Sequence, residues 1–280
     1  MKHIMFTLNC NGKLVMIDKP IIMGIINVTP DSFYPASRFQ GVDKILKQAE
    51  KMLTEGATFL DVGGQSTRPG SVQVGVEEEL NRAIASIESL HRNFPEAIIS
   101  TDTYYSRVAS AAVAAGAGMV NDISGGTLDP ALIETVGTLN VPYVCMHIKG
   151  TPGTMQLQPS YDHVSKEVLD YFIIRLETCK HAGINDVIID PGFGFGKNAS
   201  HNLRLLKDLS IFKIFDRPLM AGLSRKSTVY KTLGITVEES LNGTTVLHTI
   251  SLLNGANILR VHDVREAAEA IKLVEAYHYA

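Results

Sequence analysis

The feature of this sequence that most restricts its fold is a regular alternation of two patterns from residue 21 to the C-terminus. Short runs of apolar, largely β-branched residues alternate with longer stretches whose apolar residues recur at helical spacing. The short runs cover residues 21–27, 58–63, 98–103, 119–123, 142–147, 187–190, 218–223 and 256–261. Continuous apolar character of this kind is typical of parallel strands that are covered on both faces. The alternation therefore predicts a parallel sheet with a helix after each strand.

The intervening stretches carry two signals of helices. In three of them, apolar residues fall on one helical face: Leu80, Ile84, Ile87 and Leu90; Val164, Val168, Phe172 and Leu176; and Leu247, Ile250 and Leu253. Four stretches also end in a glycine before the next strand, namely Gly56, Gly116, Gly183 and Gly255. Glycine readily adopts the positive φ angle that terminates many helices, so these turns indicate one repeated helix-to-strand connection.

The number of strand–helix units selects the fold. About eight units are present, the number that closes a parallel (β/α)₈ barrel, or TIM barrel, and 280 residues is close to the roughly 250 of such a barrel. We therefore expect residues 1–280 to form a single barrel domain of the α/β class, with an open doubly wound sheet as the alternative. The first 20 residues fit a β-hairpin around Asn11-Gly12, which we expect to cap the bottom of the barrel.

Composition narrows the classes of partner. Lysine plus arginine total 26 and aspartate plus glutamate total 29, a formal net charge of −3, so no basic excess points to nucleic acid or to an anionic membrane. No apolar stretch approaches the roughly 18 residues of a membrane span, and the first 20 residues lack a signal-peptide core. Cys10, Cys145 and Cys179 are widely spaced and form no metal-binding pattern, which favours a reducing compartment. We therefore expect a cytoplasmic protein.

Polar residues stand at the predicted strand ends, where (β/α)₈ enzymes carry their catalytic groups. They are Asn27, Asp61, Asp102, Asn121 with Asp122, His147, Asp190, Ser224 to Ser227, and Arg260 with His262 and Asp263. A single such residue is commonly a helix cap or a turn residue, and Asp61, Asp122 and Asp263 fit that role. Acids, amides and bases around the whole barrel instead predict a polar mouth above an apolar interior.

Three loops support a ligand site at this mouth. The segment 190–196 alternates glycine with phenylalanine, which is not a dinucleotide-binding GxGxxG motif but lets the backbone approach a flat ligand. Residues 224–227 open a short helical stretch with an arginine and a lysine, a combination that favours an anion site. Arg260 and His262 lie two apart on the last strand and so share a face, near the place where barrels often bind phosphate.

Seven segments, in this order along the chain, resemble those of the dihydropteroate synthase family. They are "MGIINVTPDSF" (23–33), "GGQSTRPG" (63–70), "NDISGG" (121–126), "MHIKGTPGTMQ" (146–156), "DPGFGFGK" (190–197), "GLSRKS" (222–227) and "RVHDV" (260–264). The resemblance implies a (β/α)₈ transferase that joins 6-hydroxymethyl-7,8-dihydropterin diphosphate to 4-aminobenzoate, releasing pyrophosphate and forming 7,8-dihydropteroate for folate synthesis. It also implies a homodimer that uses Mg²⁺ and binds sulfonamides in competition with 4-aminobenzoate.

The same resemblance assigns site residues in three groups. It places Asp102, Asn121, Met146, Asp190 and Lys226 at the pterin; Asn27, Arg68, Arg260 and His262 at the diphosphate; and Thr67, Arg68, Pro69, Phe195, Lys226 and Ser227 at 4-aminobenzoate. The catalytic group would be Asp102, Asp190, Lys226, Arg260 and His262. Asn27 would be a Mg²⁺ ligand, since a single protein oxygen suits an ion held mainly by substrate phosphates. His147 and Asp61 receive no catalytic role and are expected to be structural.

The resemblance also implies a mechanism that suits these residue types. Two carboxylates can accept the N–H groups of a pterin edge, while an amide and an ammonium complement its other polar atoms. Pyrophosphate would leave first, in an SN1-like step, and the carboxylates of Asp102 and Asp190 would favour the positive charge that develops on the pterin methylene. The loops 28–39 and 64–74 are expected to become ordered over bound substrates.

Two positions depart from the family pattern, and two alternative functions deserve weight. Gln65 stands where the family often has glutamate, and Tyr105 where lysine is common; both leave the local loop geometry open. A pterin-binding methyltransferase of the corrinoid type would share the barrel but lack the "STRPG" and "SRKS" segments. A non-catalytic pterin-binding protein would be expected to lose the diphosphate or aminobenzoate residues, all of which are present.

Overall fold

Eight parallel strands form the centre of the molecule in a computed structural model that describes residues 5–28, 38–65, 74–157 and 159–280. The strands are β3 (Ile21–Asn27), β4 (Phe59–Gly63), β5 (Ile98–Asp102), β6 (Met119–Asp122), β7 (Tyr143–Met146), β8 (Val187–Asp190), β9 (Met220–Ala221) and β10 (Ile258–Val261). Their hydrogen-bonded order is β8-β7-β6-β5-β4-β3-β10-β9. Seven of them lie close to the ranges expected from the apolar runs.

Pairing between the first and last strands closes this sheet into a barrel and excludes the doubly wound alternative. β10 pairs in parallel with β3, in a register that sets Ile258 opposite Ile21. The remaining seam, between β8 and β9, is closed by a single parallel bridge from Ile189 to Leu219. The strand expected over 218–223 is therefore shorter than predicted. Pro218 has no N–H to donate and only its carbonyl joins the ladder, by accepting from the Ile189 amide at 2.9 Å.

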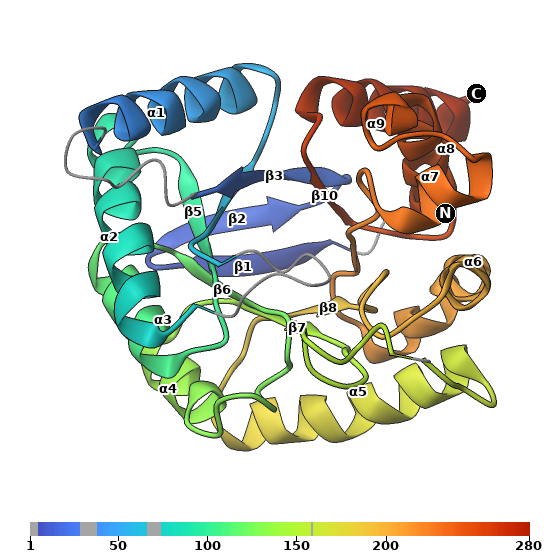
Figure 1. The fold of residues 1–280 in the computed structure, drawn as a ribbon, viewed down its shortest axis with the longest axis horizontal. Coiled ribbons are helices and arrows are strands. Elements are labelled where there is room, and N and C mark those ends of the chain that lie inside the picture. The colour runs from blue at the N-terminus through green and yellow to red at the C-terminus, as the bar shows by residue number, and fades with distance from the viewer. Residues whose placement is uncertain (1–4, 29–37, 66–73, 158) are drawn as a thin grey trace.

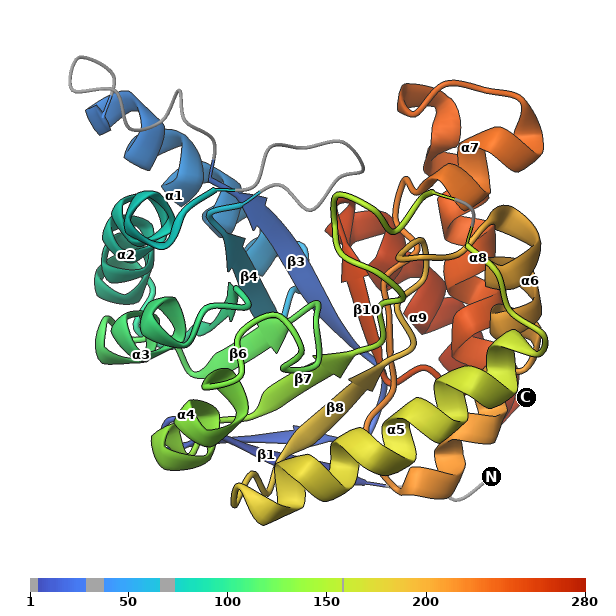
Figure 2. The same cartoon turned by 60° about the horizontal axis from the view of Figure 1, so that its bottom comes forward.

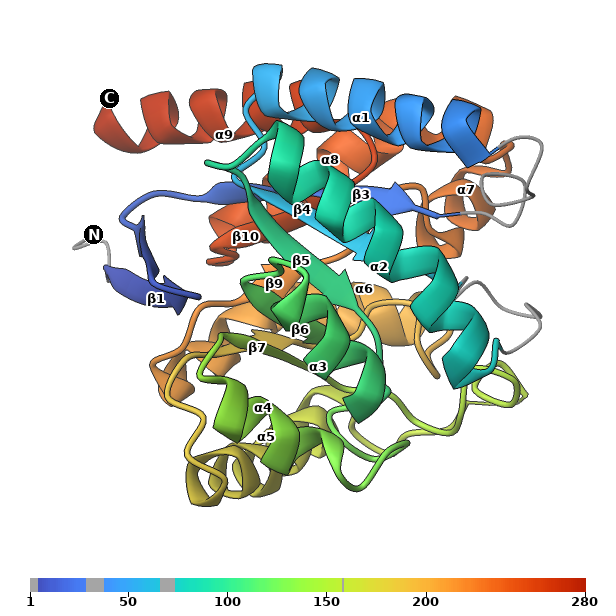
Figure 3. The same ribbon diagram turned by 90° about the vertical axis from the view of Figure 1, so that its left-hand side faces the viewer.

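Helices surround the strands on the outside, as Figures 1 and 3 show. They are α1 (Arg38–Thr54), α2 (Val76–Asn93), α3 (Ser106–Ala114), α4 (Leu132–Leu139), α5 (Val164–His181), α6 (Ala199–Lys207), α7 (Ser227–Leu233), α8 (Leu241–Leu253) and α9 (Val264–Tyr279), with 3₁₀ segments η2 (Leu209–Phe215) and η3 (Glu238–Ser240). The four glycines predicted to end helices all have positive φ angles, between 82° and 111°. Among the described helices, none is long and apolar enough to cross a membrane.

The predicted apolar face of α8 is only partly buried, whereas those of α2 and α5 are confirmed. Leu247 packs against the core, but Ile250 and Leu253 are 37% and 45% exposed, and the helix buries Leu252 together with Thr244, His248 and Ser251. These polar side chains cost little to bury where they have partners: Thr244 Oγ1 accepts from the Arg225 amide at 3.1 Å, and the Ser251 hydroxyl donates to a carbonyl of its own helix. The helix is therefore rotated so that apolar side chains face outward.

An N-terminal hairpin covers the end of the barrel at which the strands begin (Figure 2). Strands β1 (Phe6–Cys10) and β2 (Lys13–Ile17) pair antiparallel around Asn11 and Gly12, whose φ angles of 52° and 86° suit a two-residue turn. Leu8, Cys10 and Ile17 pack against the lowest layer of the barrel interior. The predicted hairpin and its capping role are confirmed.

The barrel interior changes from apolar to polar along the strands. Side chains that face inward recur every second residue, and the lowest layer contains Phe59, Ile98, Met119, Ile188 and Ile258. Two or four residues further along the same strands, the alternation brings in polar residues: Asp61, Asp102, Asn121, Asp190 and Arg260. The strands therefore deliver charged groups to one end of an apolar core, which we call the barrel mouth, together with the loops that follow them.

Candidate active site at the barrel mouth

Arg260 lies at the centre of the barrel mouth and holds two carboxylates from neighbouring strands. Its Nε donates to Asp61 Oδ2 at 2.7 Å, and one of its terminal nitrogens donates to Asp102 Oδ2 at 2.6 Å. Asp61 Oδ2 also accepts from the Asn121 side-chain amide at 2.8 Å. Asp61 is fully buried, so these bonds fix Arg260 and Asn121 relative to each other. The structural role expected for Asp61 is therefore to position Arg260 and Asn121, two residues that are predicted to bind the substrate.

The Asp102 carboxyl has an unusual protonation equilibrium. Burial raises its pKa to about 7, and the charges of Asp61, Glu79 and Asp122 act in the same direction, while Arg260 opposes them. Arg260 offsets only part of this shift, because one guanidinium is shared by two carboxylates and the pair retains an excess of negative charge in a desolvated place. Asp102 is thus poised to change its charge near neutral pH.

A second cluster joins Asp190 at the end of β8 to Lys226 in the loop after β9. Lys226 Nζ donates to the Phe193 carbonyl at 2.5 Å and lies 4.7 Å from the centre of the Phe195 ring. Burial lowers the pKa of Lys226 to about 8, although the Asp190 carboxylate opposes this shift. Burial likewise raises the pKa of Asp190, with Lys226 as the largest opposing charge. Both groups belong to the predicted pterin set, and their charges compensate each other across the barrel mouth.

Of the residues predicted to form the anion site, His262 lies at the barrel mouth and Arg225 does not. His262 remains at the barrel mouth, where its Nδ1 lies 3.0 Å from the Ser224 hydroxyl. Arg225 makes two bonds to the Asp263 carboxylate, at 2.8 and 2.9 Å, and two more to the carbonyls of Val237 and Glu238. The cationic pair predicted from Arg225 and Lys226 is therefore not formed, because the Arg225 donors are used to hold the loop after α7. Lys226 alone faces the barrel mouth.

A small apolar cluster forms the wall of the barrel mouth above β6 and β7. Met146, Met155 and Phe195 pack there with Tyr104, Ile123 and Ile148. The loop 190–196 thus separates its two aromatic residues, since Phe193 is fully buried in the main core and Phe195 lines the barrel mouth. Ser227 begins α7 next to Lys226. Thr67, Arg68 and Pro69 lie outside the described residues.

Gln65 and Tyr105, the two residues that depart from the family pattern, both take part in bonds between the loop after β4 and the loop after β5. The Gln65 side-chain amide donates to the Tyr104 hydroxyl at 2.9 Å, and the Tyr105 hydroxyl donates to the Val74 carbonyl at 3.1 Å. Gln65 and Val74 flank the undescribed segment 66–73. The two substitutions therefore anchor both ends of the loop that carries the predicted aminobenzoate residues, and they leave the strand-end residues in place.

The described residues offer few ligands for a metal. They contain no group of three or more histidine, cysteine, aspartate or glutamate side chains that could hold an ion. Asn27, at the end of β3, is exposed and presents one neutral amide oxygen at the barrel mouth. Such a donor fits an ion that is held mainly by substrate phosphates and water, as Mg²⁺ commonly is.

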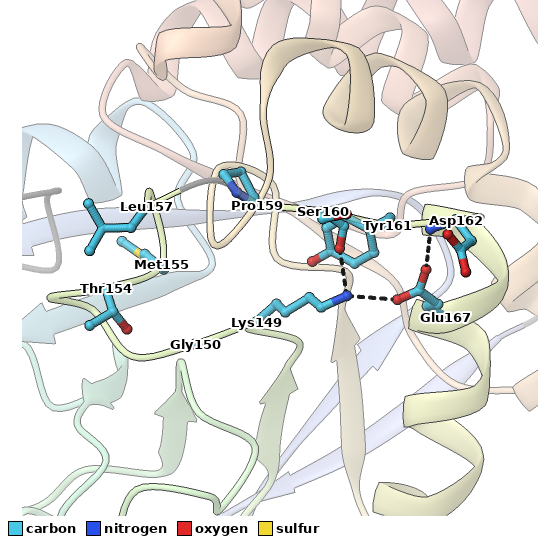
Figure 4. Close-up of a pocket in the computed structure, with 10 residues that line it drawn as sticks. All are labelled: Lys149, Gly150, Thr154, Met155, Leu157, Pro159, Ser160, Tyr161, Asp162 and Glu167. Atoms are coloured by element: carbon cyan, nitrogen blue, oxygen red, sulfur yellow. Dashed lines mark hydrogen bonds and ion pairs between the residues drawn. The ribbon is translucent and has the colours of Figure 1, made fainter.

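A cavity of about 530 Å³ lies outside the barrel mouth, in the long connection between β7 and α5 (Figure 4). Lys149 crosses it to bond with the Glu167 carboxylate at 2.9 Å and the Ser160 carbonyl at 2.6 Å, and it covers the Tyr161 ring. None of the predicted site residues lines this cavity. Its main charged groups already pair with each other, so the convergent groups of the barrel mouth remain the candidate site.

Sequence reasoning missed Lys197, which follows the glycine-rich loop and is almost completely buried. Its amine lies 2.8 Å from His147 Nδ1, so the structural role expected for His147 includes this contact. No local signal in the sequence marks Lys197, because its burial depends on a contact with His147, 50 positions away.

Comparisons with known proteins agree with this geometry. A family model described as "Pterin binding enzyme" matches residues 23–262, which include every strand end of the barrel mouth. The dihydropteroate synthase of Escherichia coli (strain K12) is 43% identical over 267 residues, or 95% of this chain and 94% of that protein. The Yersinia pestis dihydropteroate synthase with a sulfonamide drug complex has a TM-score of 0.92 at 39% identity, covering 98% of this chain and 100% of that one. The Xanthomonas albilineans dihydropteroate synthase with 4-aminobenzoic acid has a TM-score of 0.90 at 39% identity, covering 98% of each.

Proposed function

Because the chain belongs to the dihydropteroate synthases of the pterin-binding enzyme family, we propose that its barrel mouth binds the pterin diphosphate deep between the strands and 4-aminobenzoate above it. The chain is a transferase of folate synthesis, which condenses 6-hydroxymethyl-7,8-dihydropterin diphosphate with 4-aminobenzoate and releases pyrophosphate. The observation that carries the assignment of residues is the convergence of Asp102, Asn121, Asp190 and Lys226 from four different strands and loops onto one polar layer.

The pterin would lie in this layer. Asp102 and Asp190 supply carboxylate acceptors for the N–H groups of the pterin edge, and Asn121 and Lys226 complement its remaining ring atoms. Met146 pairs in register with Asp190 and belongs to the apolar cluster of the barrel mouth, so it offers a surface for the flat face of the ring. Asp61 contributes indirectly, because it holds Asn121 in place.

The diphosphate would lie toward β3 and β10. Arg260 and His262 supply cationic or N–H donors there, and Arg68 would add another from the undescribed loop. Asn27 would hold a Mg²⁺ ion, whose contribution is to neutralise the charge of the departing pyrophosphate. Binding of the diphosphate would draw Arg260 away from one of its two carboxylates, which leaves more negative charge near the pterin.

The chemistry then requires no nucleophile from the protein. The bond between the pterin methylene carbon and the diphosphate oxygen breaks first, and its electron pair leaves with pyrophosphate. Asp102 and Asp190 stabilise the cation that remains, as oriented charges in a desolvated site do. The amine of 4-aminobenzoate then forms the new carbon–nitrogen bond and gives up a proton.

The aminobenzoate would bind above the pterin, between Phe195, Lys226 and Ser227, and we assign Thr67, Arg68 and Pro69 to the same ligand. Phe195 offers an apolar ring surface, and Lys226 lies within reach of both ligands because it sits between Phe195 and Asp190. The related Xanthomonas structure with 4-aminobenzoic acid and the Yersinia structure with a sulfonamide support this second subsite. We expect sulfonamides to compete for it.

We also propose a homodimer, and the rotation of α8 indicates its surface. Val246, Ile250 and Leu253 face outward on α8, and Leu273 and Tyr277 face outward on the neighbouring α9. Exposed apolar side chains on two helices that contact each other support a dimer contact at this surface. Light scattering should give twice the chain mass, and Ile250→Glu should give monomers while Ile214→Glu, on exposed η2, should not. A monomeric wild-type protein would exclude the dimer. We also propose that the protein is cytoplasmic, as expected from its sequence.

The direct test of function uses purified protein with the pterin diphosphate, 4-aminobenzoate and Mg²⁺, and measures 7,8-dihydropteroate. We expect formation of product and of one pyrophosphate for each turnover. A rate no higher than that of the substrates alone would exclude the synthase function.

A further inference from the structure

Lys197 is the most deeply buried lysine or arginine among the described residues, and the proposed mechanism gives it no task. Its side chain is 2% exposed, yet the amine is fully engaged. Nζ lies 2.8 Å from His147 Nδ1, 2.9 Å from the Gly192 carbonyl and 3.1 Å from the Phe195 carbonyl, with a longer contact of 3.5 Å to the His147 carbonyl. A lysine amine has few donors, and here each has a partner. Burying such a group is costly, so the contacts that compensate it define the local backbone.

Two of these contacts fall on the loop Gly192–Gly196 and fix its path. Gly192, Gly194 and Gly196 have φ angles of 72°, 84° and 63°, a run of positive values that only glycine adopts readily. A Cβ atom at Gly192 would collide with the His147 carbonyl, and one at Gly196 with the Lys149 carbonyl. A glycine-rich loop with so little intrinsic preference needs external bonds to remain in one conformation. Lys197 supplies them by tying the start and the end of the loop to a single atom.

The loop so fixed presents two groups to the barrel mouth. The Phe195 side chain lines the mouth, and the Phe193 carbonyl accepts from Lys226 Nζ at 2.5 Å. Phe195 is also the residue whose carbonyl Lys197 binds, so the position of its ring depends directly on that bond. Asp190 holds the other side of the loop, through its Oδ1 and the Gly192 amide at 2.8 Å.

His147, directly after strand β7, is the partner of the Lys197 amine that lies outside the loop. The imidazole is buried edge-on against Tyr171, at 4.8 Å between ring centres, and its backbone amide donates to the Asp190 carbonyl. The ring cannot move without disturbing α5, on which Tyr171 lies. The Lys197 amine is thereby anchored to a rigid part of the barrel rather than to the loop alone.

We propose that Lys197, held by His147, is a positioning residue that sets the conformation of Gly192–Gly196 and through it the affinity of the site for 4-aminobenzoate. This inference rests on the proposed function, because it assigns Phe195 and Lys226 to the aminobenzoate subsite. Asp190 and Lys226 also touch the loop, through the Gly192 amide and the Phe193 carbonyl, but the pterin carboxylates themselves lie at the ends of β5 and β8. Binding of the pterin diphosphate should therefore depend on Lys197 much less than binding of 4-aminobenzoate does.

The test is the split between the two substrates in Lys197→Met, which keeps the length and packing of the side chain but removes its donors. We expect KM for 4-aminobenzoate to rise by about tenfold or more, since a buried hydrogen-bond donor is lost to two carbonyls. KM for the pterin diphosphate should change by less than about threefold on the same scale. Lys207→Met, on the exposed face of the adjoining α6, is the matched control and should leave both values unchanged. Titration of a sulfonamide should show the same loss of affinity in Lys197→Met.

A second pair of variants covers the possibility that Lys197→Met yields little folded protein. His147→Leu replaces the imidazole acceptor with an apolar side chain against Tyr171, and Lys197→Gln retains an N–H donor for the carbonyls. His147→Leu should show the rise in KM for 4-aminobenzoate, and Lys197→Gln should restore part of the loss.

Equal changes in both KM values, or a change in kcat alone, in any folded variant would overturn the positioning role. Because each variant is compared with active wild-type protein, this outcome would leave the proposed function standing. Absence of wild-type activity would instead contradict the proposed function itself.

Discussion

Replacing Asp61 with asparagine should move the pH dependence of the reaction toward acid. The carboxylates of Asp61 and Asp102 share one terminal nitrogen of Arg260, at 2.7 and 2.6 Å, so their accepting oxygens are at most 5.3 Å apart. At an effective dielectric constant of about 20, two unit charges at that distance repel by about 3 kcal/mol, equivalent to about two pKa units. Removal of the Asp61 charge should therefore lower the pKa of Asp102 from about 7 by about one to two units.

The assay is the pH profile of kcat/KM for the pterin diphosphate, which reports ionisations of the free enzyme. If the Asp102 carboxylate stabilises the developing cation, wild-type kcat/KM should decline as the pH falls through about 7. In Asp61→Asn the midpoint of this decline should lie at lower pH. The plateau should also be lower, by about a hundredfold, because Arg260 and Asn121 lose the atom that orients them.

Asp170→Asn, on the exposed surface of α5, provides the control for loss of one carboxylate far from the barrel mouth. Its profile should match that of the wild type. A midpoint in Asp61→Asn that stays at the wild-type pH would refute the idea that the two carboxylates share one guanidinium electrostatically, even if the plateau falls.

Three further predictions concern single side chains. Lys226→Ala should reduce kcat/KM by about a hundredfold or more, since a cation serving both substrates is lost, and a near-normal value in steady-state kinetics would contradict that role. Arg260→Ala should weaken the binding of pyrophosphate by about tenfold or more, because a fork-shaped donor is removed, and calorimetry showing unchanged affinity would exclude the proposed diphosphate site. Burial lowers the pKa of His248 to about 4 in the folded state, so its contribution to stability is present above the unfolded pKa of about 6.5 and is lost as the pH falls toward 4. Urea unfolding of the wild type and His248→Gln at pH 7 and pH 4.5 should differ in their pH dependence by about 2 to 3 kcal/mol; parallel behaviour would show that His248 titrates normally.

Much of the fold could be predicted because the relevant signals are local. A buried parallel strand needs a continuous apolar run, and a helix that returns to the sheet needs a residue with positive φ, so both leave marks in a few adjacent positions. The failure at α8 has a different origin. Its sequence carries apolar residues on more than one side, and which of them face the core depends on contacts between residues far apart in the sequence, such as that of Thr244 with the Arg225 amide 19 positions away.

The same limit applies to predicting the candidate site from the sequence. That Asp102, Asn121, Asp190 and Arg260 would share the barrel mouth follows from strand alternation and closure of the sheet. Which of them bond to one another does not, because the Arg260–Asp61 contact joins residues 199 positions apart and depends on the register of three strands. The withdrawal of Arg225 from the anion site was equally hidden, since its partner Asp263 follows a different strand.

The charges of the barrel mouth explain why this arrangement suits the reaction. Asp61, Asp102 and Asp190 set three buried carboxylates against two cations, Arg260 and Lys226. Burial disfavours the charged form and so raises the pKa of Asp102 and of Asp190; neighbouring carboxylates act in the same direction at Asp102, whereas Lys226 and Arg260 oppose the shift at Asp190. The excess of negative charge makes the site complementary to a ligand that becomes positively charged. If a diphosphate group engages Arg260 as proposed, the imbalance near the pterin would increase, and it would be relieved by the cation that forms once pyrophosphate departs. In the proposed arrangement, the unfavourable electrostatics of the free protein would favour the transition state, in which positive charge develops on the pterin, over the ground state, in which the pterin ring is uncharged.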